Sequence, residues 1–152
     1  MTDTLATPRF GLPLLAVAQA QKEVTHNEAL TLLDALLHPA VEDGPLSTPP
    51  GTPAPAPGQG WIVGTAPTGA WEGQDGAIAL WTGGGWRFVA AREGMRIVRL
   101  SDGAWLCFHG GMWVAPATID PPGGGAVIDV EARAALVALL ASLEAQGLMI
   151  SG

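Results

Sequence analysis

The sequence predicts an α+β protein with an N-terminal helix, a small antiparallel β-domain of duplicated hairpins, and a C-terminal helix on a glycine-rich hinge. The first observation is a repeat. Asp75 to Trp86 and Asp102 to Trp113 both read Asp-Gly-Ala, three residues, an aromatic, one residue, Gly-Gly, one residue, Trp. Apolar runs that end in Gly-Gly are typical of hairpins, and their repetition indicates duplication. The second observation is a leucine-rich segment at helical spacing on each side of the repeat.

Residues 1–43 are expected to form an extended arm followed by a helix within 18–38. Prolines in the arm exclude a helix there, and Pro39 ends the helix that follows. The pattern Thr25-x-x-Glu28 matches a capping box, which predicts that the helix is capped near Thr25.

The leucines of this first helix form two neighbouring apolar faces. Leu30, Leu33 and Leu37 share one face, and the next carries Leu32 and Leu36 with Ala29. Because the apolar arc is wide, we expect the helix to pack on two surfaces, its own domain and a neighbouring subunit.

Residues 44–60 carry six prolines and no charge. Such composition favours extended polyproline II backbone, so this segment is predicted to be a semi-rigid strap or spacer. A role as an SH3-type ligand is the alternative, but no basic residue flanks the prolines to fix its orientation.

Residues 61–118 are predicted to form the β-domain, and all six tryptophans lie in it. Glycine-rich turns separate apolar segments of strand length. The expected strands are 60–64, 77–82, 86–90, 95–100, 104–109 and 112–115. Residues 104–109 are apolar on both faces, which indicates a strand that is central or covered by a partner.

Residues 119–152 are predicted to be a hinge and a second helix. The hinge is the run from Pro121 to Gly125, and the helix spans about 130–146, capped by Asp129 and stopped by Gly147. Its apolar stripe consists of Leu136, Leu139, Leu140 and Leu143. The helix either associates with other chains or folds back on its own β-domain, and the sequence leaves both open.

The composition points away from several functions. A net charge of −7 argues against general nucleic-acid binding, and no stretch approaches the ~18 apolar residues of a membrane span. The N-terminal apolar run resembles a secretion signal, but Gly11 and Pro13 interrupt it. Cys107 and His109 share a strand face, yet two ligands are too few for a structural zinc site. We therefore expect no catalytic residues, no metal and no cofactor.

The tryptophans are the remaining candidates for ligand binding, because exposed indole faces stack on sugar rings. The candidate glycan-binding residues are Trp71, Trp81, Trp86 and Trp105. Trp71, in a glycine-flanked loop, is predicted to be the best exposed of them. The alternative is that Trp81, Trp86, Trp105 and Trp113 form cross-strand pairs in the core.

Several motifs together resemble an uncharacterised family of bacterial prophages and gene transfer agents. They are Thr7-Pro8-Arg9-Phe10-Gly11-Leu12-Pro13, the run Ala18-Gln19-Ala20-Gln21-Lys22-Glu23-Val24-Thr25-His26-Asn27-Glu28-Ala29-Leu30, Leu33-Asp34-Ala35-Leu36, Gly60-Trp61-Ile62-Val63-Gly64, Gly69-Ala70-Trp71, and Trp81, Trp86 and Arg92-Glu93-Gly94. The resemblance covers about residues 7–115. The Gln-Ala-Gln-Lys-Glu-Val-Thr-His-Asn-Glu run is its most specific part.

The resemblance implies a fibre or head-spike component of a phage-like particle. This chain is similar to a spike base or adaptor, which a separate fibre protein would complete. The residues expected to mediate oligomerisation and attachment are Gln21, Lys22, His26, Asn27, Leu30, Leu33 and Leu37. The implied partners are further copies of the chain, as a trimer or pentamer, and capsid or tail proteins. Such a protein would be assembled in the bacterial cytoplasm and released within the particle.

Two functional hypotheses follow from the sequence. The first is a structural base or adaptor of a head spike or tail fibre, acting by oligomerisation and attachment. The alternative is a carbohydrate-binding receptor module for host surface polysaccharide. An enzyme acting on surface glycan is the least favoured third reading.

Overall fold

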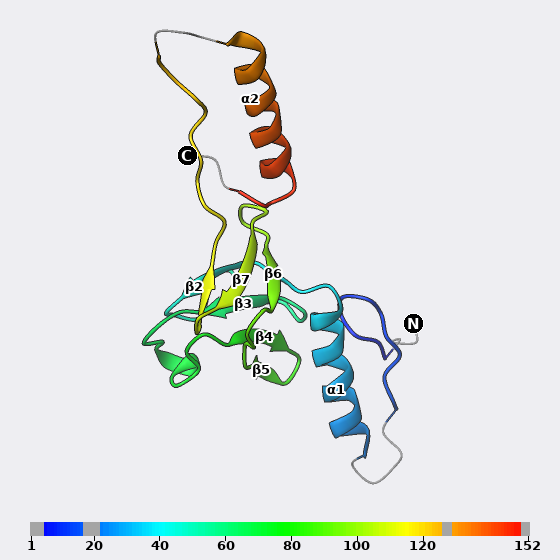
Figure 1. The fold of residues 1–152 in the computed structure, drawn as a ribbon. Coiled ribbons are helices and arrows are strands. Elements are labelled where there is room, and N and C mark those ends of the chain that lie inside the picture. Colours follow the sequence, from blue (N-terminus) through cyan, green and yellow to red (C-terminus); the bar gives the residue numbers. More distant parts are fainter. Residues whose placement is uncertain (1–4, 17–21, 126–128, 150–152) are drawn as a thin grey trace.

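The computed structural model describes residues 5–16, 22–125 and 129–149. Two four-stranded sheets form a body, helix α1 lies beside it, and helix α2 projects away from the opposite end (Figure 1). The predicted α+β class is confirmed. The elements are α1 Lys22–Leu37, β1 Ala40–Val41, β2 Asp43–Leu46, β3 Gly60–Val63, the 3₁₀ turn η1 Gly69–Trp71, β4 Ile78–Thr82, β5 Gly85–Val89, β6 Arg96–Arg99, β7 Trp105–His109, β8 Met112–Val114 and α2 Val130–Ala145.

The duplication seen in the sequence extends to whole sheets. One sheet has the order β2-β3-β4-β5 and the other β1-β6-β7-β8. In each sheet a short strand pairs in parallel with the second strand, and the other pairs are antiparallel. The two repeated hairpins, β4–β5 and β7–β8, are the last hairpins of the two sheets. A single four-strand pattern therefore occurs twice in the body.

Two expectations need correction. The β-domain is mixed rather than antiparallel, because β1 and β2 pair in parallel with β6 and β3. The strap predicted over 44–60 is not a spacer along its whole length, since Asp43–Leu46 is strand β2. Both added strands are short, and their partners lie far along the chain. All six predicted strands are present within one or two residues of their expected ends.

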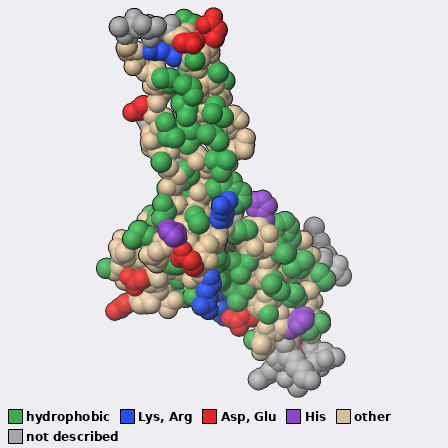
Figure 2. All heavy atoms as spheres, viewed as in Figure 1, with side chains coloured by type: hydrophobic (Ala, Val, Ile, Leu, Met, Phe, Trp, Pro, Cys, Tyr) green, Lys and Arg blue, Asp and Glu red, His purple; other side chains and the backbone are tan. Residues whose placement is uncertain are grey.

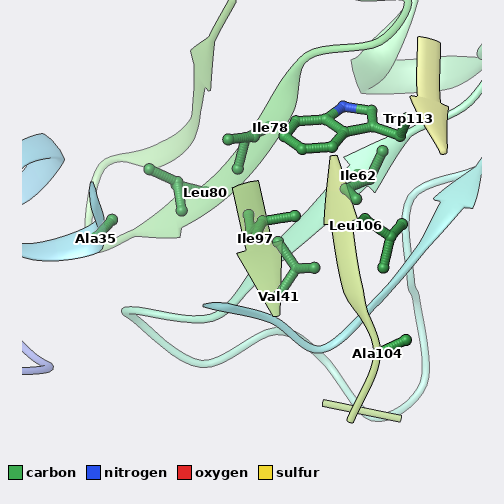
Figure 3. Close-up of a cluster of buried hydrophobic side chains, with 9 residues drawn as sticks. All are labelled: Ala35, Val41, Ile62, Ile78, Leu80, Ile97, Ala104, Leu106 and Trp113. Atoms are coloured by element: carbon green, nitrogen blue, oxygen red, sulfur yellow. The ribbon is translucent and has the colours of Figure 1, made fainter. Parts of the chain in front are cut away.

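The main hydrophobic core lies between the two sheets and is closed by α1 (Figure 3). Alternation along each strand sends every second side chain inward. The cluster consists of Ala35, Val41, Ile62, Ile78, Leu80, Ile97, Ala104, Leu106 and Trp113. Leu32 and Leu36 of α1 pack against it, which confirms that one face of this helix meets its own domain.

The other face of the β2–β5 sheet carries a second core, which is rich in tryptophan. Trp61, Val63, Trp71, Ala77 and Ala79 are buried there. The loop that contains η1 supplies Trp71 and covers the sheet. This sheet is therefore buried on both faces, whereas the outer face of the β1-β6-β7-β8 sheet bears Trp105, which is 37% exposed.

The helix ends are set by local chemistry. α1 begins at Lys22, so the predicted cap at Thr25 is wrong: Thr25 lies inside the helix and is exposed. α2 begins and ends as predicted. Asp129 accepts a hydrogen bond from the backbone N–H of Ala132, and Gly147 terminates the helix with a positive φ of 68°.

The end of α2 is fixed to the body at one point. The N–H of Trp105 donates to the carbonyl of Gly147 at 2.9 Å. A Cβ at position 147 would lie 2.2 Å from the carbonyl oxygen of Gly103, so only glycine fits there. Within the described residues, neither helix combines the length and apolar character needed to cross a membrane.

Candidate functional site

The predicted attachment residues on α1 divide into an exposed stripe and an internal contact. His26, Leu30, Leu33 and Leu37 are spaced four, three and four residues apart and therefore share one side of the helix. His26 and Leu37 are exposed, Leu33 is 53% exposed and Leu30 is half-buried. We call these four residues the α1 stripe. It lies away from the face that Leu32 and Leu36 bury against the sheets.

Three other predicted residues do not belong to the stripe. Asn27 holds the N-terminal arm: its side chain accepts from the N–H of Leu15 at 2.9 Å and donates to the carbonyl of Leu15 at 3.0 Å. Lys22 is the first residue of α1, and its side chain is not described. Gln21 lies outside the described residues.

The arm is locked against α1 by a charged contact that sequence reasoning did not identify. Asp34 is buried, and its carboxylate accepts from the backbone N–H groups of Arg9 and Phe10, each at 2.8 Å. Hydrogen bonds of this kind to a charged acceptor are stronger than neutral ones. The arm is thus held in one position along the side of the helix.

The guanidinium of Arg9 ties three further segments together. It donates to the carbonyls of Gly58, Ala35 and Ala40, which lie in the strap, in the last turn of α1 and in β1. The Ala35 carbonyl is one of those that a helix end leaves without an internal partner. Burial holds the pKa of Arg9 below its ordinary value, and the negative charges of Asp34 and Glu42 oppose this shift.

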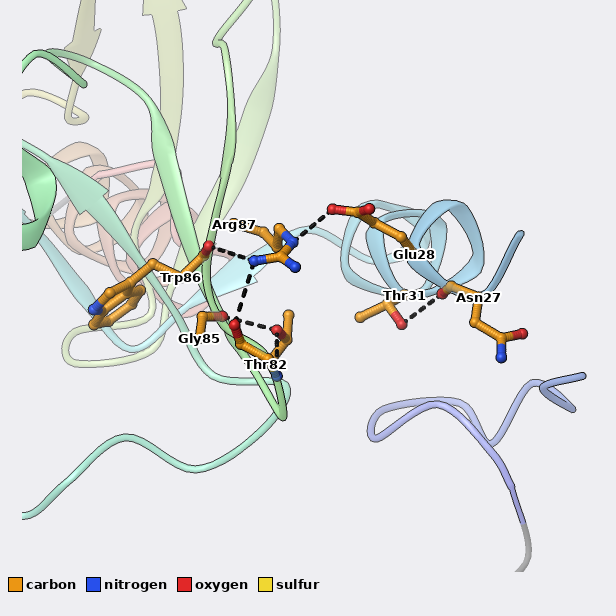
Figure 4. A network of polar contacts seen from close by, with 8 residues as sticks. Asn27, Glu28, Thr31, Thr82, Gly85, Trp86 and Arg87 are labelled. Atoms are coloured by element: carbon orange, nitrogen blue, oxygen red, sulfur yellow. Dashed lines mark hydrogen bonds and ion pairs between the residues drawn. The ribbon is translucent and has the colours of Figure 1, made fainter. Parts of the chain in front are cut away.

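A second contact joins α1 to the β4–β5 hairpin (Figure 4). Arg87 donates from Nε to Glu28 at 2.5 Å and from its terminal nitrogen to the carbonyl of Trp86 at 3.0 Å. The residues around this pair line a shallow hollow of about 190 Å³. The pair is partly exposed, so it orients the two elements more than it stabilises them.

The predicted glycan-binding tryptophans do not form one site. Trp71 is 0% exposed, so the expectation that it is the best exposed tryptophan is wrong. It packs edge to face on Trp86, with ring centroids 5.2 Å apart. Trp61 and Trp81 contact the same Trp86 ring at 5.7 and 4.9 Å. These four rings fill a core and stabilise it through their mutual geometry.

The cross-strand alternative holds for one predicted pair. Trp81 and Trp86 are register partners in β4 and β5. Trp113 pairs with Phe108 rather than with Trp105, with ring centroids 5.3 Å apart. Each copy of the repeat therefore contains one edge-to-face aromatic pair at the same place in its hairpin.

Trp105 stands apart, on the outer face of the second sheet. It lines a hollow of about 380 Å³ with Arg96, His109, Val114 and Leu148 among its neighbours. His109 contacts the carboxylate of Glu93 through Nδ1. An exposed indole beside charged and polar groups could bind a planar or ring-shaped polar ligand.

The acidic turn residues have structural partners. Asp102 binds Arg99 through both carboxylate oxygens, and this hydrogen bonding with Arg99 lowers the pKa of the Asp102 carboxyl. Asp75 accepts from the N–H of Ala66, which has a positive φ of 48°. Among the described residues, no group of three or more His, Cys, Asp or Glu side chains is placed to hold a metal ion.

Comparison with known proteins gives a family. The sequence model of the family described as "Protein of unknown function (DUF2793)" matches residues 26–114, from α1 to the end of β8. The arm and α2 lie outside the matched span. No curated protein matches the chain. Since the matched span is more than half of the sequence, this chain belongs to the DUF2793 family.

Proposed function

We propose that this protein is a structural subunit of a phage-like particle, the base or adaptor of a head spike or tail fibre. It acts by attachment and oligomerisation, in contact with capsid or tail proteins and with a separate fibre protein. It is assembled in the bacterial cytoplasm and leaves the cell in the released particle. Membership of a phage-associated family supports this proposal.

The α1 stripe is the observation that carries the proposal. Its three leucines project from a helix whose other sides are occupied by the two sheets and by the arm. An apolar row of this kind on a helix surface is the usual anchor for a groove on another protein. Because Arg9 and Asp34 fix the arm to the helix, the attachment surface is presented in one conformation.

Replacing Leu33 with Glu is expected to reduce incorporation of the protein into particles at least ten-fold. The charge would have to be buried against the particle, whereas in the free protein it remains in water. The measurement is the amount of tagged protein in particles purified from the producing bacterium. Val24→Glu is the matched control, because Val24 lies on the same helix, is 62% exposed and is outside the stripe.

Two results would count against this attachment surface. One is normal incorporation of Leu33→Glu; the other is an equal loss with Val24→Glu. A protein that is absent from particles in its wild-type form would overturn the proposed function as a whole.

A carbohydrate-binding receptor module is the second candidate, and the exposure of Trp105 favours it. Of the four candidate tryptophans, Trp105 presents the most open indole, beside Arg96 and His109. Sugar rings stack on such an indole while their hydroxyls bind neighbouring polar groups.

On this second candidate, wild-type protein binds a surface polysaccharide on a glycan array and Trp105→Ala lowers the signal at least ten-fold. Met112→Ala, on the neighbouring strand β8, serves as the control and should bind normally. If no glycan binds wild-type protein, or if Trp105→Ala binds unchanged, the receptor candidate is wrong.

A further inference from the structure

The α2 helix is apolar along most of its length, yet none of its residues is buried. It carries only three charges, which are Glu131, Arg133 and Glu144. An isolated helix of 16 residues is marginally stable in water. Figure 2 shows the column formed by α2 and the segment beside it, with hydrophobic side chains over most of the visible surface. Such a helix requires a partner.

One side of α2 already has a partner within the chain. Val137, Leu140, Ala141 and Glu144 line a hollow shared with residues 119–121 and Met149. This contact accounts for Leu140 of the predicted stripe, and Met149 is buried. It leaves the adjacent side of the helix uncovered.

The uncovered side has the spacing of a helix–helix seam. Ala132, Leu136, Leu139 and Leu143 follow one another at intervals of four, three and four residues, which is the repeat of a coiled-coil interface. Leu136 is 48% exposed and Leu139 is 55% exposed. No charged residue lies within this row, which we call the α2 seam. Ala135 and Ser142, which flank the seam, are small enough to allow close approach of a second helix.

The distribution of polar groups along α2 indicates what covers the seam. The charges Glu131 and Arg133 lie in the first turn with the cap Asp129, at the tip far from the body. The apolar residues continue to the base, where Leu148 and Trp105 remain exposed. A second α2 in the same direction matches polar tip with polar tip and apolar base with apolar base. An antiparallel copy would place the charged tip of one helix against the apolar base of the other.

We propose that the partner of α2 is α2 of a second copy of this chain, packed in parallel along the α2 seam. The inference rests on the proposed role as an assembly subunit, and it names the surface through which subunits join. The contact of Gly147 with Trp105 and Gly103 fixes the base of the helix. Both chains therefore present their seams from the same side of the body.

The double variant Leu136→Glu/Leu139→Glu tests the seam. We expect wild-type protein to have the mass of a dimer or larger oligomer by sedimentation and mass photometry, and the double variant to have the mass of a monomer. The matched control is Ala134→Glu/Ala138→Glu, which adds the same charges on exposed positions of the opposite side and should remain oligomeric. Circular dichroism and tryptophan fluorescence establish that the β-body stays folded in each variant.

A cysteine at position 143 tests the direction of packing. In a Cys107→Ser background, Leu143→Cys should form a disulfide between chains under oxidation, because parallel helices bring the two positions together. An antiparallel pair places position 143 opposite Ala132, so it would not cross-link. Absence of the cross-link overturns the parallel arrangement.

The outcomes separate this inference from the proposed function. A monomeric wild-type protein, or a seam variant that keeps the wild-type mass, overturns self-association through α2. If such a protein still enters particles through the α1 stripe, the proposed function stands and the α2 seam binds another protein. If the seam variant is monomeric and wild-type protein never enters particles, the proposed function fails while the inference holds.

Discussion

Replacing Asp34 with alanine is expected to lower the free energy of unfolding by about 3 kcal/mol, because it removes the acceptor of two hydrogen bonds to a charged group. The carboxylate is buried and receives the N–H groups of Arg9 and Phe10. Without it, both donors are left unpaired and Arg9 loses the nearer of its two acidic neighbours. The measurement is urea unfolding at pH 7 at a fixed protein concentration, since association would raise the apparent stability.

The loss should be local to the arm as well as global. Arg9 is held by three carbonyls in the wild-type protein, so we expect trypsin to cleave after Arg9 much faster in Asp34→Ala. Asp34→Asn keeps the shape and one acceptor, and it should lose about half as much stability. Glu28→Gln, which removes only a partly exposed pair with Arg87, should cost about 0.5 kcal/mol or less. A stability of Asp34→Ala within about 1 kcal/mol of wild type would contradict the role of this anchor.

The strands could be predicted from sequence because their signals are local. Each predicted strand is an apolar run bounded by glycine turns, and the C-terminal end of α2 follows from Gly147 alone. β1 and β2 could not be predicted in the same way. β2 contains Gly44 and Pro45, and both strands exist only because β6 and β3 pair with them across long stretches of chain. Propensity carries no information about such partners.

The candidate surfaces divide along the same line. Helical periodicity was sufficient to place Leu30, Leu33 and Leu37 on one side of α1, and the structure places them together. The anchor between Arg9 and Asp34 joins residues 25 positions apart. Nothing in the spacing of the sequence connects them, although both occur in the motifs that carry the family resemblance. An arginine in an arm and an aspartate in a helix are ordinary surface residues until the fold brings them together.

Replacing Trp71 with alanine is expected to lower the free energy of unfolding by about 3–5 kcal/mol, the usual cost of deleting a large buried aromatic side chain. Trp71 is fully buried in the second core and contacts the ring of Trp86. Its removal leaves a cavity under the loop that contains η1 and uncovers one face of the β2–β5 sheet. Thermal and urea unfolding, followed by far-UV circular dichroism, measure the change.

Trp71→Phe separates packing from loss of the indole. The Nε1–H of Trp71 is buried and has no acceptor among the described residues, so phenylalanine loses volume but also removes an unpaired donor. We therefore expect Trp71→Phe to cost about 1–2 kcal/mol, well below the alanine variant. Trp105→Ala, at the partly exposed indole, should cost about 1 kcal/mol or less. If Trp71→Ala is as stable as wild type, the second core does not stabilise the body. If it unfolds as expected, any loss of particle adsorption or glycan binding in that variant reports unfolding, and only Trp105→Ala can test a sugar site.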